Sequence, residues 1–233
     1  VLRASSRFSA DKPSDYMESV AIGDGQLSIR QGLLRSLSSL ISVASGGSIG
    51  REGAMVHLGA LGASVLGRFA PFNRSRLRLI VACGAAAGVA AAYGAPIAGA
   101  LFVAEIVLGT MAIHTVGPLL LAAAVSSFTV KALGGHLVSY TLPAVPTFGI
   151  DAMAPMLILG IVAGFGAPYF LKFLDLFRSA FKKTGWSEPW RLGLGGLLLG
   201  VILVFMPLVA GNGYNVVASL LGTSWPWHAV LLV

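Results

Sequence analysis

Long apolar runs separated by short polar breaks dominate the sequence. Several of them reach the roughly 17–25 residues that an α-helix needs to cross a hydrocarbon layer of about 30 Å. None alternates at period two, as the strands of an outer-membrane barrel would. The pattern therefore predicts an all-α, polytopic membrane protein. Its expected helical runs are 29–45, 53–68, 79–111, 115–133, 153–181, 192–209 and 213–222, with a short helix starting within 11–20, a loop over 134–151 and a last span from near Pro226.

The run 79–111 is interrupted by the sequence YGAP at 93–96. Proline lacks an amide donor and disfavours helix in the residue before it, so a half-length helix is expected on either side of the break. Helices this short cannot cross a bilayer alone, and lipid tolerates broken helices only where protein or a polar cavity satisfies the freed backbone groups. In transporters such breaks mark the substrate site, with half-helix amino termini aimed at anions. The break is therefore the first indication of transport.

The amino-acid composition supports the membrane assignment and argues against a nucleic-acid partner and a metal site. Hydrophobic residues make up 56% of the chain and charged residues only 11%, against roughly 25% charged in soluble proteins. The net charge of +7 indicates no nucleic-acid partner, because the basic residues lie at helix ends, as they do beside membrane spans. The four histidines lack metal-ligand spacing, so no metal and no cofactor is expected. With Val1 at the start and an apolar run at Val233, we interpret the chain as an internal piece of a longer protein.

Small residues recur at four-residue intervals, a spacing that lets helix backbones approach closely. Packing between helices of one chain is favoured over a dimer contact as their role. The sets with this spacing are Gly59–Ala63–Gly67, Gly84–Gly88, Gly160–Gly164 and Gly196–Gly200.

Arg51 and Glu52 are the only charged residues in 36–67. They fall within GGSIGREG, where glycines such as Gly50 and Gly53 permit tight turns and leave main-chain amides uncovered. An apolar helix begins directly after them, and a helix amino terminus carries about half a positive charge and several amides without partners in the helix. Together these features predict an anion-binding site.

Glu52 at that terminus can occupy the amides that an anion would otherwise bind. Protonation neutralises the side chain, which can then leave the amides so that an anion enters. We therefore interpret Glu52 as a proton-sensitive gate. The alternative, a local cap and salt bridge with Arg51, is less favoured because a carboxylate in a membrane segment costs ~2.5–3.5 kcal/mol and usually marks function. His57 follows one turn and one residue later, so it is not expected on the face of Glu52.

The sequence GREG at 50–53, followed by GAAAGVAAAYGAPIAGALFVAE at 84–105, resembles the CLC family of chloride channels and chloride/proton antiporters. The second motif is far more specific than any single glycine motif, and the similarity runs from about residue 13 to the end. The resemblance implies that 1–233 is part of a single CLC-type transmembrane domain built from antiparallel repeats, truncated at both ends, with no soluble regulatory domain visible. It also implies a multi-pass protein of the bacterial inner membrane, surrounded by lipid, that forms a homodimer with a path for chloride and other small anions in each subunit.

The resemblance also assigns roles to single residues. The glutamate of the family's first motif is its gate, which is Glu52 here, while the proline that follows the motif in the family is Ala54. A family serine motif that contacts the central anion matches at KPSDYME, 12–18, and points to Ser14. The alternative is that Ser14 caps a helix over 15–22. The anion-binding residues that follow from the resemblance are Ser14, Gly50, Arg51, Glu52 and Gly53.

Family antiporters end the second motif with two glutamates, the second of which accepts protons from the cytoplasm. Here Glu105 matches the first and Ile106 replaces the second. Since isoleucine cannot carry a proton, we expect either a channel of the voltage-gated type or an antiporter whose proton path uses Glu52 and Glu105. Glu105 as the mere polar end of a helix is equally supported. Alternatives are a fluoride or other anion/proton antiporter and, remotely, an intramembrane hydrolase, for which no nucleophile–base pair or metal motif is found.

Overall fold

The computed structural model describes residues 15–50, 52–69, 71–135, 149–150 and 153–222. Every regular element among these residues is a helix, which confirms the all-α prediction for this part of the chain. The chain divides into two compact units, one formed by Val1–Thr141 with Ala210–Ala218 and the other by Leu142–Val209 with Ser219–Val233. That residues 1–233 belong to a single transmembrane domain stays a prediction.

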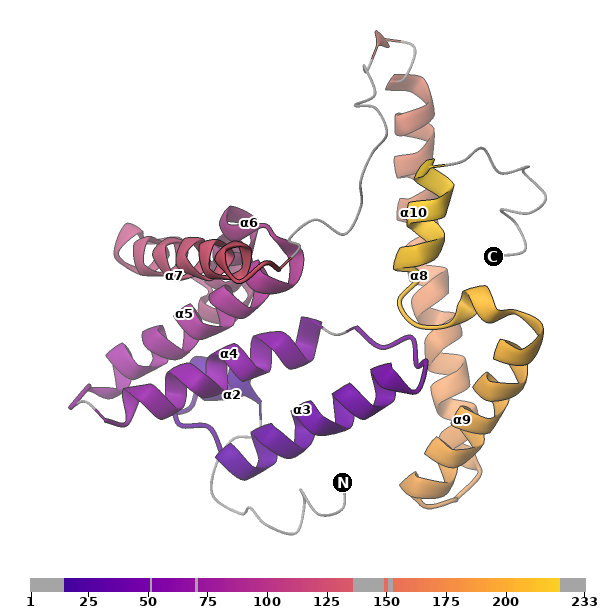
Figure 1. Ribbon diagram of the computed structural model, residues 1–233, viewed down its shortest axis with the longest axis horizontal. Coiled ribbons are helices and arrows are strands. Elements are labelled where there is room, and N and C mark those ends of the chain that lie inside the picture. The colour runs from indigo at the N-terminus through magenta and orange to yellow at the C-terminus, as the bar shows by residue number, and fades with distance from the viewer. Residues whose placement is uncertain (1–14, 51, 70, 136–148, 151–152, 223–233) are drawn as a thin grey trace. The chain divides into compact units, whose positions relative to one another are not determined.

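Helices α2 to α7 form the body of the first unit (Figure 1). Helix α4 packs most extensively on α5, which also contacts α6 and α7, and α3 lies against α4. The element bounds are α2 Tyr16–Ala21, α3 Ile29–Ala44, α4 Glu52–Gly67, α5 Arg74–Tyr93, α6 Pro96–Phe102, the π-helical turn η1 Val103–Leu108 and α7 Ile113–Ala132.

The contact between α4 and α5 is close because glycines of the two helices face one another. A Cβ on Gly59 would lie 2.3 Å from the carbonyl oxygen of Gly84, and a Cβ on Gly88 would lie 2.7 Å from that of Met55. Without side chains at these points the two backbones meet directly. The predicted packing role of the small-residue spacing is confirmed for this helix pair.

The predicted break after residue 93 is also confirmed. Helix α5 ends at Tyr93, and Gly94 follows with a φ of +67°, a left-handed conformation that glycine adopts readily. Pro96 then occupies the first position of α6, where the missing amide is not needed. Helix α6 continues directly into η1, which contains Glu105 and which the sequence pattern did not predict. Such π-helical turns are frequent at functional sites.

The predicted start of α5 is wrong by five residues, because the helix includes the polar turn RSRLR before the apolar run. The side chain of Asn73 caps the helix by accepting a hydrogen bond from the amide of Arg76 at 2.9 Å. Arg78 donates hydrogen bonds to the carbonyls of Val20 and Ala21 at the end of α2. These carbonyls have no partner within their own helix, so the arginine joins the two helices.

The second unit contains α8 Met153–Lys183, α9 Glu188–Phe205 and η3 Pro207–Val209. Within the part of this unit that the structure describes, α8 buries no residue, and a Cβ on Gly160 or Gly164 would meet nothing within 4 Å. The packing role of these glycines stays a prediction. Helix α9 starts four residues before its predicted start because Pro189 can occupy the first turn of a helix.

Full-length and shorter apolar helices occur together. Three described helices are long and apolar enough to cross a membrane, namely α5, α7 and α8. The apolar segments Gly53–Gly67, Pro96–Leu108 and Pro189–Phe205 are shorter. This mixture agrees with the predicted polytopic architecture with interrupted helices. The half-length helix predicted before the break is wrong, because α5 already begins at Arg74 and its 20 residues are long enough to cross a membrane. The predicted run 213–222 corresponds to α10 Tyr214–Gly222, whereas the span expected from near Pro226 lies outside the described residues.

Candidate functional site

The loop between α3 and α4 leads a glycine-rich segment to the start of α4. The amide of Ser45 donates to the carbonyl of Ile41 at 2.9 Å and closes α3, after which Gly46 turns the chain with a φ of +86°. The carbonyl of Gly46 accepts a hydrogen bond from the amide of Gly211 at 3.0 Å. Helix α4 then starts at Glu52. Its first amides have no acceptor within the helix, as at the start of any α-helix.

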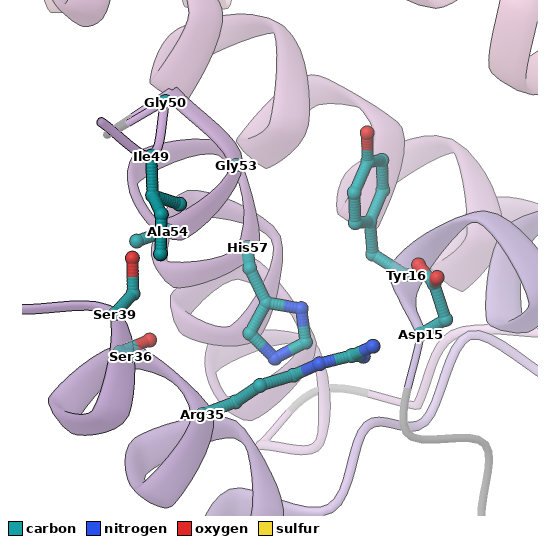
Figure 2. A pocket seen from close by; sticks show the side chains of 10 residues that line it. All are labelled: Asp15, Tyr16, Arg35, Ser36, Ser39, Ile49, Gly50, Gly53, Ala54 and His57. Atoms are coloured by element: carbon teal, nitrogen blue, oxygen red, sulfur yellow. The ribbon is translucent and has the colours of Figure 1, made fainter. Parts of the chain in front are cut away.

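A cavity of about 300 Å³ lies beside the start of α4 (Figure 2). Two of the predicted anion-binding residues, Gly50 and Gly53, line it. Arg51, Ser14 and the side chain of Glu52 lie outside the described residues, and their roles stay predictions. The other residues that line this cavity are Asp15, Tyr16, Arg35, Ser36, Ser39, Ile49, Ala54 and His57.

Helix α2 begins at the wall of the same cavity. Asp15 caps this helix, because its carboxylate accepts a hydrogen bond from the amide of Met17 at 3.1 Å. The alternative interpretation of Ser14 as the cap is therefore wrong, since the cap position belongs to the next residue. Asp15 and Tyr16 bring the start of α2 and the start of α4 to one cavity.

Two further polar residues of this cavity were missed by the sequence reasoning. Arg35 reaches from α3 past the His57 ring toward Asp15 (Figure 2). The rings of His57 and Tyr16 lie 6.4 Å apart between centroids. The sequence could have predicted that His57 lies at this cavity, because His57 is four residues after Gly53 and so shares a helix face with that glycine.

Charges of both signs surround the cavity. Arg35 and the amino-terminal end of α4 are positive, while Asp15 is the one acidic residue among the described lining residues. Ser36 and Ser39 add hydroxyl groups on consecutive turns of α3. Across the part of the chain that the structure describes, no group of three histidine, cysteine or acidic side chains is placed to hold a metal ion.

A second cavity, of about 640 Å³, also reaches the start of α4. It extends from Gly53 and Tyr16 to Tyr93 and Phe102, and its wall is mostly apolar. Glu105 follows Phe102 by three residues, is exposed and lines neither of these two cavities. The structure therefore does not join Glu105 to the start of α4, and its place on a proton path stays a prediction.

These features define a polytopic helical membrane protein in which helix amino termini meet at a polar cavity beside interrupted helices. The chain belongs to the voltage-gated chloride channel family, the CLC family, whose model matches residues 3–233. It is 47% identical over 223 residues to a ClcB-like chloride channel protein of Ralstonia nicotianae, a match that covers 94% of this chain and 52% of the relative. It is 43% identical over 211 residues to a voltage-gated ClC-type chloride channel ClcB of Citrobacter koseri, covering 90% of this chain and 50% of the relative.

A solved structure has the same fold. It is the crystal structure of a CLC-type fluoride/proton antiporter, with a TM-score of 0.74, 28% identity and coverage of 93% of this chain and 56% of that one. The resemblance to the CLC family and the membrane-transporter fold are thereby confirmed, and the family consists of channels and transporters rather than hydrolases. The chain spans about half the length of the curated relatives it matches.

Proposed function

We propose that the complete protein moves chloride across the bacterial inner membrane and that Glu52 gates the path. The observation that carries this proposal is the start of α4 at a cavity lined by Gly50, Gly53 and the cationic Arg35. The relatives named as chloride channels support chloride as the transported ion.

The gating step follows from competition for the same amides. A deprotonated Glu52 is a tethered anion beside the first amides of α4, so it excludes a free anion from them. When the carboxyl is protonated, its attraction to the helix dipole and its need for the amides both fall. A chloride ion can then take the position, with Ser14 as a further proposed contact. Arg51 precedes the helix and adds positive charge to this region.

A second candidate function is fluoride/proton antiport. The structural similarity to a CLC-type fluoride/proton antiporter favours it. Chloride remains the first choice because relatives named as ClcB or ClcB-like chloride channels share 42% to 47% identity with this chain, whereas the antiporter shares 28%. For either candidate the proposed proton path uses Glu52 and Glu105, since Ile106 has no titratable group.

The assembly is also a proposal. We propose a homodimer in which each subunit holds its own anion path, surrounded by membrane lipid. The family resemblance is its basis, and large apolar side chains exposed on α8, such as Phe165 and Tyr169, agree with a surface that meets lipid or protein.

The decisive experiment uses Glu52→Gln in the full-length protein, reconstituted in liposomes. Efflux is measured with chloride, nitrate and fluoride at several pH values. Glutamine keeps the size of the side chain but cannot titrate, so we expect chloride efflux to lose its dependence on pH. Glu18→Gln is the matched control, because Glu18 is an exposed carboxylate in the first turn of α2 that lines neither cavity. Chloride efflux with the same pH dependence in Glu52→Gln and in the unmodified protein would refute the gate, and efflux of fluoride alone would favour the second candidate.

A further inference from the structure

Four arginines gather at the α4–α5 corner, residues 68–69 and 71–78, where α4 ends and α5 begins (Figure 1). Arg68 directly follows α4 and donates a hydrogen bond to the carbonyl of Leu27, just before α3. Arg78 donates to the carbonyls of Val20 and Ala21 at the end of α2. These two arginines therefore hold the corner against the α2–α3 loop. The 16 residues of α4 put the corner about 24 Å along the helix from the gate motif.

The other two arginines of the corner have no partner in the described structure. Arg74 and Arg76 are exposed at the start of α5, and neither guanidinium makes a hydrogen bond or an ion pair with any residue that the structure describes. The sequence contains no aspartate or glutamate between residues 53 and 104. Asp24, in the nearby α2–α3 loop, instead accepts a hydrogen bond from the amide of Gln26 at 3.0 Å. The corner therefore carries positive charge that this part of the chain does not neutralise.

Large apolar side chains are exposed beside these arginines. In the loop between the two helices Phe69 is 84% exposed and Phe72 is 42% exposed. At the end of α2, Ile22 is 82% exposed and directly follows Ala21, whose carbonyl Arg78 contacts. Single exposed apolar residues are ordinary, but a group of them beside unpaired cations indicates an interaction surface.

Helix α5 places this surface relative to the membrane. The helix is long and apolar enough to cross a bilayer, and its apolar run starts at Leu77. Arg74 and Arg76 precede that run, so they lie at the boundary between hydrocarbon and water, where basic residues commonly flank membrane spans. The phosphate groups of phospholipids lie at the same boundary. A guanidinium donates paired hydrogen bonds to phosphate oxygens, and apolar side chains can be buried at the level of the upper acyl chains.

We propose that the α4–α5 corner binds an anionic phospholipid, with Arg74 and Arg76 on its phosphate and with Phe69 and Phe72 beside its acyl chains. The apolar side chains favour a lipid over a soluble phosphate, which would use the arginines alone. Basic surfaces next to membrane helices attract anionic headgroups in this way. The proposal does not depend on which ion the protein moves, and it gives a role to an end of α4 that the gating scheme does not use.

The test measures phospholipid binding to the full-length protein in detergent by native mass spectrometry. The protein is titrated with dioleoyl phosphatidylglycerol and, separately, with the zwitterionic dioleoyl phosphatidylcholine, and we expect phosphatidylglycerol to bind more tightly. Arg74→Gln combined with Arg76→Gln should weaken phosphatidylglycerol binding about thirtyfold, since each basic residue near an anionic surface contributes about fivefold. Arg74→Lys combined with Arg76→Lys should weaken it less, because lysine keeps the charge and loses only the paired geometry. Phe69→Ser should weaken it about tenfold through the lost apolar contact.

The matched control is Lys131→Gln, which removes an exposed basic residue from the last turn of α7, another membrane-length helix, and should leave the binding unchanged. Equal binding of the two phospholipids by the unmodified protein overturns the proposal. So does unchanged phosphatidylglycerol binding in the glutamine pair, or equal weakening by the lysine pair or by Lys131→Gln, because the charge of the corner would then be irrelevant. Displacement of phosphatidylglycerol by inorganic phosphate at the same concentration overturns the lipid as occupant. Should the glutamine pair fail to fold, unchanged binding in Phe69→Ser overturns the proposal.

Discussion

The glycine contact between α4 and α5 gives a prediction whose size follows from the geometry. A Cβ added at Gly84 would lie 2.3 Å from the carbonyl oxygen of Gly59 and 2.5 Å from the Cβ of Ala63. Ordinary contact begins at 3.4 Å, so the new methyl group is about 1 Å too close to a backbone atom that cannot rotate away. Gly84→Ala must therefore push the two helices apart.

Overpacking of this kind costs about 1–3 kcal/mol in the free energy of unfolding. The upper part of that range is expected here because both opposing atoms belong to the backbone or lie next to it. In the full-length protein, of which this chain spans about half, a loss of about 2–3 kcal/mol corresponds to a fall in Tm of roughly 2–3 °C. The melting temperature of the detergent-solubilised full-length protein, followed by its tryptophan fluorescence, measures it.

Gly62→Ala is the matched control for this prediction. Gly62 lies within α4, and a Cβ there would meet nothing within 4 Å among the described residues. Both substitutions gain the same helix propensity of about 1 kcal/mol, so their difference isolates the contact. If Gly84→Ala melts at the same temperature as Gly62→Ala, the backbones of α4 and α5 do not meet as described.

Two further predictions concern hydrogen bonds of the first unit. Ser64→Ala should lower the free energy of unfolding by about 2–3 kcal/mol, because its fully buried hydroxyl accepts from the amide of Leu27 at 2.9 Å and donates to the carbonyl of Gly25 at 2.8 Å; a denaturant titration that shows no loss contradicts it. Asn73→Ala should cost about 1 kcal/mol through loss of the α5 cap, whereas Asn73→Asp should keep the cap and the stability, as thermal melting can establish.

Most of the helices were predictable because a helix in lipid needs a long apolar run, which is easy to recognise in a sequence. Apolar runs, Gly94 and Pro96 marked where most helices begin and end, and the structure agrees with them. The start of α5 was missed for the opposite reason, since its arginine-rich first turn reads as polar. That turn is helical because Asn73 caps it and because Arg78 finds acceptors on α2, a partner that no local pattern reveals.

The sequence predicted only those residues of the candidate site that lie close together along the chain. Gly50 and Gly53 lie in one short motif, and the structure brings both to one cavity. Arg35 and Ser36 come from another helix, so their place beside the motif depends on how α3 packs against α4. Helical periodicity could have placed His57 at this cavity, because His57 lies four residues after Gly53 and shares a helix face with it. It lies five residues after Glu52, which does not put those two residues on one face.

Proton coupling gives the last prediction, and it rests on the surroundings of η1. Glu105 is exposed in this turn and lines neither described cavity, and Ile106 beside it is 56% exposed and cannot titrate. We therefore expect a chloride gradient across liposomes that contain the full-length protein to drive chloride efflux without uphill movement of protons, as a pH electrode in weakly buffered solution would record. Uphill proton movement at a fixed ratio to chloride would contradict this expectation. In that case Glu105→Gln decides the route, because loss of proton movement with continued chloride efflux would make Glu105 the carrier that replaces the missing second glutamate.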